Sequence, residues 1–161
     1  MQPKVSYREA PLLFRNLGNH KFENATASTG AAFTRPIVAR GAAYADFDHD
    51  GDLDILVSTN NGPAYLFRND GGNRNHWLSL RLTGSKSNRD GIGAVVRVES
   101  PSGKQWSMVR SGSSYCSQSD LALTFGLGKD TTASVVVEWP SGVKQQLGSV
   151  KVDQRITATE P

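Results

Sequence analysis

The chain has 161 residues, a formal net charge of +3 and one cysteine, Cys116. This length allows one domain or two small ones with a real core, and a single cysteine excludes an internal disulfide framework. Because the lysines and arginines are scattered along the chain, the mild positive charge does not support nucleic-acid binding.

The composition favours β structure and no membrane span. Gly, Ser, Thr and Val are frequent, and helical spacing of Ala, Leu, Glu and Lys is rare, so an all-β fold is expected. No apolar run approaches the roughly 20 residues that cross a bilayer. The N-terminal residues 1–4 lack the apolar core of a signal peptide, so an export signal is expected outside this chain.

The first third of the chain predicts short strands separated by turns. Alternation over residues 5–8 predicts an edge strand, and two short apolar runs within 12–24 flank a Leu-Gly-Asn turn, which predicts a hairpin. The small polar residues 25–33 predict one helical turn or a loop. Residues 37–45, 53–58 and 64–67 are expected to form further strands.

A short repeat lies within this region. The sequence Leu-Phe-Arg-Asn begins at Leu13 and again at Leu66, 53 positions later. Periods of this length are typical of propeller blades and related β arrays.

The acidic stretch 46–54 predicts a calcium loop between two strands. Carboxylates stand at loop positions 1, 3, 5 and 9, with Gly51 at position 6, and this spacing directs several hard oxygen ligands at one centre. We expect Ca²⁺ to be bound by side-chain oxygens of Asp46, Asp48, Asp50 and Asp54 and by the backbone carbonyl of Asp52. Without a cation the crowded carboxylates would repel one another, so the loop would open or their pKa values would rise.

Two alternatives for this stretch are weaker. An EF-hand loop ends in a bidentate Glu at position 12, whereas position 12 here is Val57, within a β-branched run. A solvated acidic turn is the plainer alternative, but chance rarely spaces carboxylates in this way. Phe47 and His49 occupy outward positions, and a hard cation does not seek an imidazole.

Residues 41–57 resemble the core of an FG-GAP or VCBS repeat, the blade of integrin-type β-propellers, and the resemblance extends over 1–73. It implies a partial propeller-like blade sheet with a calcium-binding hairpin loop. A propeller has about four to eight blades, and this chain has material for one or a little more. The exposed sheet is therefore expected to dock on the rest of the chain, on further blades or on another subunit in an oligomer.

The second half, residues 74–161, predicts an antiparallel β-sandwich of about seven strands. The expected strands are 77–82, 92–99, 105–110, 121–125, 133–139, 143–147 and 155–159, with a hairpin turn at 140–142. This half resembles the ASPIC/UnbV domain, found after FG-GAP/VCBS repeats in exported bacterial proteins and in the cartilage acidic protein family. The resemblance rests on residues 75–78, 84–94, 110–115, 125–128 and 137–142, and it implies little about activity.

The sequence carries no motif for catalysis, so we expect no enzyme. A Gly-x-Ser-x-Gly elbow, a phosphate loop, His-Glu-x-x-His and paired cysteines are all missing from it. The polar loop 88–91 and the Ser-rich loop 111–120 could meet at one end of the sandwich and bind a ligand. The candidate residues are Asn88, Arg89, Asp90, Trp106 and Tyr115. The plainer interpretation is that Trp77, Trp106 and Trp139 pack in the interior or at its rim.

Taken together, these patterns predict a calcium-binding, non-catalytic module of a secreted or cell-surface protein that acts in adhesion, scaffolding or assembly. Extracellular calcium loops bind with dissociation constants of about 10⁻⁴ to 10⁻³ M, which only external calcium would fill. The partner is an unknown protein or glycan. A carbohydrate-binding module and a hydrolase-accessory domain are the alternatives.

Overall fold

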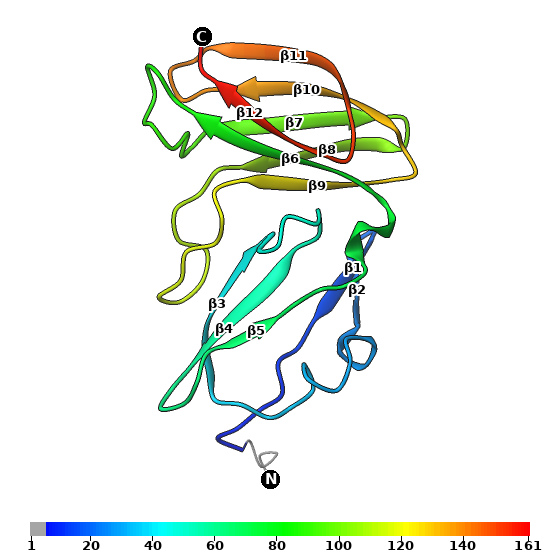
Figure 1. Cartoon of the computed structure of the whole chain (residues 1–161), viewed down its shortest axis with the longest axis vertical. Helices are drawn as coiled ribbons and strands as arrows, with labels where there is room; N and C mark the ends of the chain where they lie inside the picture. Colours follow the sequence, from blue (N-terminus) through cyan, green and yellow to red (C-terminus); the bar gives the residue numbers. More distant parts are fainter. Residues whose placement is uncertain (1–5) are drawn as a thin grey trace.

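The structure is a computed structural model that describes residues 6–161. Strands dominate it, and its only helices in the described range are two short 3₁₀ turns. The predicted all-β fold is therefore confirmed. Figure 1 shows two stacked halves, a small N-terminal group of sheets and a larger C-terminal sandwich that contains the C-terminus.

The N-terminal half contains a hairpin and a three-stranded sheet. The hairpin pairs β1 (Phe14–Gly18) with β2 (Lys21–Asn24), and the 3₁₀ helix η1 (Thr26–Ser28) follows it. The blade sheet has the order β3-β4-β5, built from β3 (Ala39–Ala45), β4 (Asp54–Thr59) and β5 (Tyr65–Phe67). The predicted hairpin, helical turn and three strands are all present.

The predicted edge strand at 5–8 is not confirmed. Val5 lies outside the described residues, and residues 6–8 form no strand. The Ser6 backbone N–H donates to Glu9 Oε1 at 2.8 Å, and the Ser6 hydroxyl donates to the Arg8 carbonyl. Such local side-chain bonds compete with strand pairing, so the extended chain begins only at the bridge between Glu9 and Ile37.

The C-terminal half is a sandwich of two sheets. Its elements are η2 (Gly72–Arg74), β6 (His76–Thr83), β7 (Val95–Ser100), β8 (Gly103–Met108), β9 (Leu123–Gly128), β10 (Thr132–Glu138), β11 (Lys144–Lys151) and β12 (Gln154–Thr159). One sheet has the order β11-β10-β7-β8 and the other β12-β6-β9. The change of sheet falls at η2, beside the predicted boundary at 73.

One strand pair departs from the antiparallel pattern. β12 runs parallel to β6, with Gln154 opposite Leu78 and Thr159 opposite Thr83. The tight turn at Asp153 carries the chain from β11 in one sheet to β12 in the other, so these sequence neighbours do not form a hairpin. Non-local pairing of this kind leaves no turn signal in the sequence.

The hydrophobic core belongs to the sandwich. Inward residues alternate along β6, β7, β9 and β10, as the two-residue period of a strand requires. With a few residues beside or beyond these strands they form one buried cluster: Leu78, Leu80, Leu82, Ala94, Val96, Val98, Val109, Leu123, Phe125, Leu127, Ala133, Val135, Val137, Trp139 and Ala158. Trp139 is buried as predicted, and its indole N–H donates to Gln145 Oε1 at 3.0 Å. Trp106 is 60% exposed. The expectation that it packs inside was wrong, because it pairs with Arg97 on the outward face of β7 and β8.

The blade sheet has little core of its own. In residues 6–73 the buried apolar side chains are Phe33, Ile37 and Val57. Leu56 pairs with Leu66 across β4 and β5, and both remain 47% exposed on one face. A single blade cannot cover both its faces, and this sheet accordingly leaves large apolar side chains exposed.

Glu160 joins the end of the chain to the loop after β6. It is 3% exposed, and its Oε2 accepts hydrogen bonds from the backbone N–H groups of Ser85, Lys86 and Ser87 at 2.9, 2.8 and 2.6 Å. Its Oε1 accepts from the hydroxyls of Ser87 and Ser141. Burial alone would raise the pKa of Glu160, but these hydrogen bonds outweigh it and lower the pKa to about 2.

This pKa predicts a specific loss of stability in acid. Because the folded pKa lies below the ordinary value of 4.5, ionised Glu160 stabilises the fold above that pH, and the stabilisation is lost as the pH falls from 4.5 towards about 2. Glu160→Gln should therefore be less stable at pH 7 and show a flatter decline over this window, measured by urea unfolding at several pH values. The exposed Glu99→Gln, which loses only a surface pair with Lys104, is the matched control. A Glu160→Gln curve parallel to that of the unaltered chain would contradict the assignment.

Candidate metal centre

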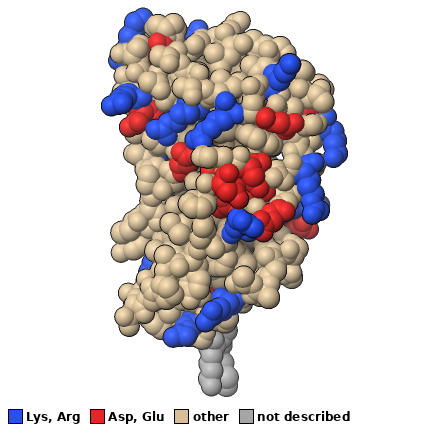
Figure 2. All heavy atoms as spheres, in the orientation of Figure 1, with Lys and Arg blue, Asp and Glu red and all other residues tan. Residues whose placement is uncertain are grey.

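The acidic loop 46–54 connects β3 to β4, as the sequence predicts. Its two ends are paired, with Ala45 opposite Asp54. Inside the loop the backbone turns through left-handed conformations at His49 (φ 61°) and Gly51 (φ 99°). The loop lies at the end of the blade sheet that faces the sandwich (Figure 1). Figure 2 shows acidic side chains gathered at this level, with basic side chains around them.

Three of the predicted ligands converge. One carboxylate oxygen from each of Asp46, Asp48 and Asp50 lies within 4.8 Å of the others. Calcium binds its oxygen ligands at 2.3–2.6 Å, so oxygens on opposite sides of one ion are separated by about twice that distance. The separation in this loop therefore suits three ligands of a single Ca²⁺.

Two buried oxygens in the loop lack partners. Asp46 Oδ1 and Asp52 Oδ1 have no hydrogen bond within the described residues, although Asp46 is 8% and Asp52 5% exposed. A buried polar atom without a partner destabilises the fold by about 1–3 kcal/mol, and more when it is charged. A hard cation is a partner for such oxygens, so the donor set fits calcium.

Asp54 and Asp52 have additional roles that the sequence analysis did not foresee. Asp54 is 2% exposed, and its two oxygens accept backbone hydrogen bonds from Phe47 at 3.0 Å and Asn69 at 2.8 Å. Asp52 Oδ2 accepts from the backbone of Gly72 at 2.9 Å and Asn73 at 3.4 Å. These carboxylates fix the loop to the segment after β5. Ligation by the Asp54 side chain and the Asp52 carbonyl stays a prediction, since a carboxylate oxygen has a second lone pair.

Crowding changes the acidity of one loop residue. Burial raises the pKa of Asp52 above its ordinary value, and the charges of Asp50 and Asp54 raise it further, while hydrogen bonds from Gly72 and Asn73 oppose the change. A bound Ca²⁺ would favour the ionised form of all these groups. The loop is thus arranged around negative charge that a cation would compensate.

Gly51 is required by both conformation and space. Its φ of 99° is a left-handed value that side chains rarely adopt, and a Cβ there would overlap the indole of Trp77. Trp77 comes from β6, the first strand of the sandwich. Sequence reasoning missed this contact, because no local signal joins a loop glycine to a tryptophan 26 positions later.

The residues proposed for carbohydrate binding lie in three places. Asn88 closes its own loop through two hydrogen bonds with the Ile92 backbone, and Asp90 pairs with Arg81 at 3.4 Å. Arg89 is exposed on the same loop, and Trp106 lies on the outward face of β8. Tyr115, 70% exposed, lines a cavity of about 350 Å³ with Ala39 and Arg40. Arg81 also pairs with Asp120, at the end of loop 111–120, at 3.5 Å, whereas Tyr115 of that loop lies against β3.

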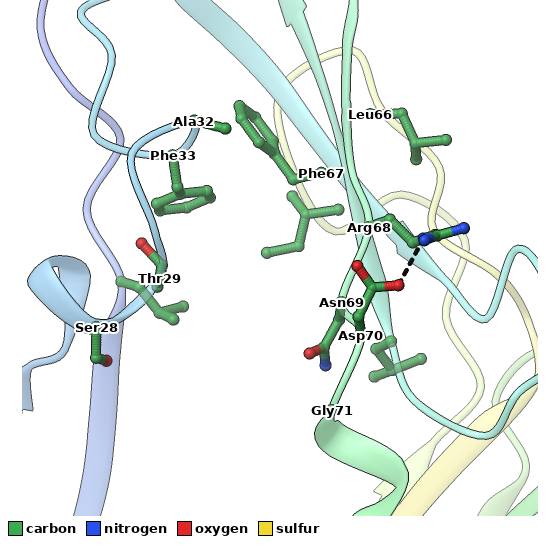
Figure 3. Close-up of a pocket in the computed structure, with 13 residues that line it drawn as sticks. Ser28, Thr29, Ala32, Phe33, Leu66, Phe67, Arg68, Asn69, Asp70 and Gly71 are labelled. Atoms are coloured by element: carbon green, nitrogen blue, oxygen red, sulfur yellow. Dashed lines mark ion pairs between the residues drawn. The ribbon is translucent and has the colours of Figure 1, made fainter.

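A larger pocket of about 710 Å³ lies between the segment after the hairpin and the blade sheet. Phe33 and Phe67 face each other across it with ring centroids 5.0 Å apart, and Arg68 pairs with Asp70 at its edge (Figure 3). Its lining contains no histidine, cysteine or lysine.

Comparison with known proteins identifies both halves. Residues 5–57 match the family model of an FG-GAP-like repeat, and residues 84–161 match that of ASPIC and UnbV. The chain is 35% identical over 106 residues to cartilage acidic protein 1 of Xenopus tropicalis and of Homo sapiens, and 34% identical to that of Mus musculus. The matched stretch covers 63% of this chain and 16% of each relative. Across residues 6–161, no helix has the length and apolarity to cross a membrane.

The contact between Gly51 and Trp77 yields a prediction. Gly51→Ala should destabilise the chain more than Gly18→Ala, because both positions have positive φ but only Gly51 lacks room for a Cβ. Backbone strain alone accounts for about 1–3 kcal/mol. Adding Trp77→Ala should restore part of the excess loss, as a double-mutant cycle in urea unfolding would measure. Equal losses for the two glycine variants would contradict the close approach.

Proposed function

We propose, from the premise that the chain carries an FG-GAP-like repeat followed by an ASPIC/UnbV domain, that it is a calcium-binding, non-catalytic extracellular module for assembly or adhesion. The observation that carries the proposal is the convergence of three carboxylate oxygens beside the buried, unpartnered Oδ1 of Asp46. Asp46, Asp48 and Asp50 would hold the ion. Calcium supplies positive charge at this point, and the chain's own hydrogen bonds hold the loop around it.

An extracellular location is supported by two arguments. The relatives are named cartilage acidic protein 1, and cartilage is a matrix tissue. A loop with a dissociation constant of about 10⁻⁴ M would be almost filled at millimolar calcium. Binding to the folded state alone would then add about 1.4 kcal/mol of stability.

An assembly role is supported by the open faces of the blade sheet. Leu13, from the first copy of the repeat, lines the large pocket together with Leu53 and Ile55 of the blade. Leu66, its counterpart in the second copy, also borders this pocket, but its side chain points to the opposite side of β5 from Phe67 (Figure 3). On that side it lines a smaller pocket with Leu56 and Asp120. Just as Leu13 of the first copy packs beside the blade sheet, Leu66 and Leu56 would pack against another unit of the same repeat type, from this protein or from a second copy.

Calcium binding is tested by thermal unfolding. Millimolar calcium should raise the midpoint relative to EDTA by a few degrees, as expected for about 1.4 kcal/mol in a chain of this size. Asp46→Asn should abolish this shift, while Asp70→Asn, in an exposed pair with Arg68, should retain it. An unchanged midpoint, together with no heat in a calcium titration, would refute the proposed site.

The open face is tested by sedimentation velocity. The chain should self-associate as its concentration rises, because exposed apolar patches favour association. Leu66→Glu should suppress this by placing a charge on the blade face. Trp106→Glu changes an apolar residue on the sandwich that is even more exposed than Leu66, and it should leave the association unchanged. A chain that stays monomeric at high concentration would argue against a second copy as the cover.

A further inference from the structure

We infer that the acidic loop 46–54 is the joint between the two halves, meaning that its contacts hold the sandwich against the blade sheet. Calcium occupancy would then fix the orientation of the sandwich relative to the blade sheet. This inference rests on the proposed calcium binding. It concerns the loop's contacts with the C-terminal half, which ligation of an ion does not itself require.

The first set of contacts joins the loop to the segment that connects the two halves. Asp52 Oδ2 accepts hydrogen bonds from the backbone of Gly72 and Asn73, at the η2 turn that leads into β6. The Asn73 amide donates to Asp50 at two atoms, the carbonyl oxygen at 3.2 Å and Oδ2 at 3.0 Å. Asp50 is also one of the three converging carboxylates. One residue therefore faces the ion position and the connecting segment together.

The loop also touches the sandwich directly. The Trp77 indole lies against Gly51, where a Cβ would have no room. The position of Trp77 is fixed in turn by Asp153, whose Oδ1 accepts from the Trp77 N–H at 3.2 Å and whose own N–H donates to the Trp77 carbonyl at 2.7 Å. The start of β6 is thus held to the turn before β12, and it meets the loop at Gly51.

A third contact comes from β12. Arg155 Nη1 lies 3.3 Å from His49 Nδ1, and Arg155 Nη2 donates to Asp120 Oδ2 at 3.2 Å. Asp120 in turn donates its backbone N–H to the Tyr44 carbonyl of β3 at 2.9 Å. His49 and Gly51, which alternate with predicted ligands, therefore face the sandwich.

Loss of the ion should weaken this joint without separating the halves. Unscreened carboxylates at this spacing repel one another, and opening of the loop would move Asp50 and Asp52 away from the connecting segment. Two hydrogen bonds join β3 to the Ser-rich loop. The Ala42 N–H donates to the Ser114 hydroxyl and the Tyr44 N–H to the Ser119 hydroxyl, both at 3.3 Å. They use no carboxylate of the loop, so they would persist as a hinge.

Hydrogen exchange of the chain, followed by mass spectrometry, tests the inference. At calcium ten times the measured dissociation constant, exchange in residues 69–77 should be about tenfold slower than in EGTA. Residues 95–108, in the sandwich core, should not change. In saturating calcium, residues 69–77 of Asn73→Ala should exchange at least about fivefold faster than those of the unaltered chain, because the variant loses two hydrogen bonds. The neighbouring exposed Asn75→Ala is the matched control.

Calorimetric titration of each variant with calcium separates the two proposals. Absence of binding by the unaltered chain would refute the calcium site and the joint together. Binding with unchanged exchange over 69–77 would overturn the joint while leaving the calcium site in place. Exchange in Asn73→Ala equal to that in Asn75→Ala would overturn it as well, because the connecting segment would then not be held through Asp50.

Discussion

The structure depends on negative charge concentrated at the place where its halves meet. Three carboxylate oxygens lie within 4.8 Å of one another, and burial and neighbouring charge raise the pKa of Asp52 beside them. Such an arrangement is unfavourable by itself, since like charges at this distance in a partly buried site are only weakly screened. The divalent cation proposed for this loop would convert the repulsion into attraction.

The two halves reach stability in different ways. The sandwich has a closed core in which Leu78, Leu80, Val96, Val135 and Val137 are fully buried, and hydrophobic burial of this kind stabilises a domain without help. The blade sheet leaves Leu56 and Leu66 half exposed and buries few apolar residues. Its order depends on contacts beyond its own strands: the Ser-rich loop along β3 and the acidic loop at its end.

Local patterns in the sequence predicted most of the strands and the loop. Period-two alternation and turn residues located β6 to β12, and carboxylate spacing identified Asp46, Asp48 and Asp50 as a group. The missed features depend on residues far apart in the chain. Parallel pairing of β12 with β6, the Trp77 contact with Gly51 and the outward face of Trp106 are set by packing between elements, which no window of the sequence contains.

The loop 46–54 makes two sets of contacts because its residues alternate in direction. Asp46, Asp48 and Asp50 turn one oxygen each towards a common centre. His49, between Asp48 and Asp50, and Gly51, after Asp50, meet Arg155 and Trp77. The spacing that brings ligands to one ion therefore also presents the intervening residues to the sandwich. A substitution at either set would disturb the other, because the backbone turns at His49 and Gly51 place both. The proposed metal binding and the contacts with the sandwich would thus be coupled through the backbone of one nine-residue stretch, 46–54.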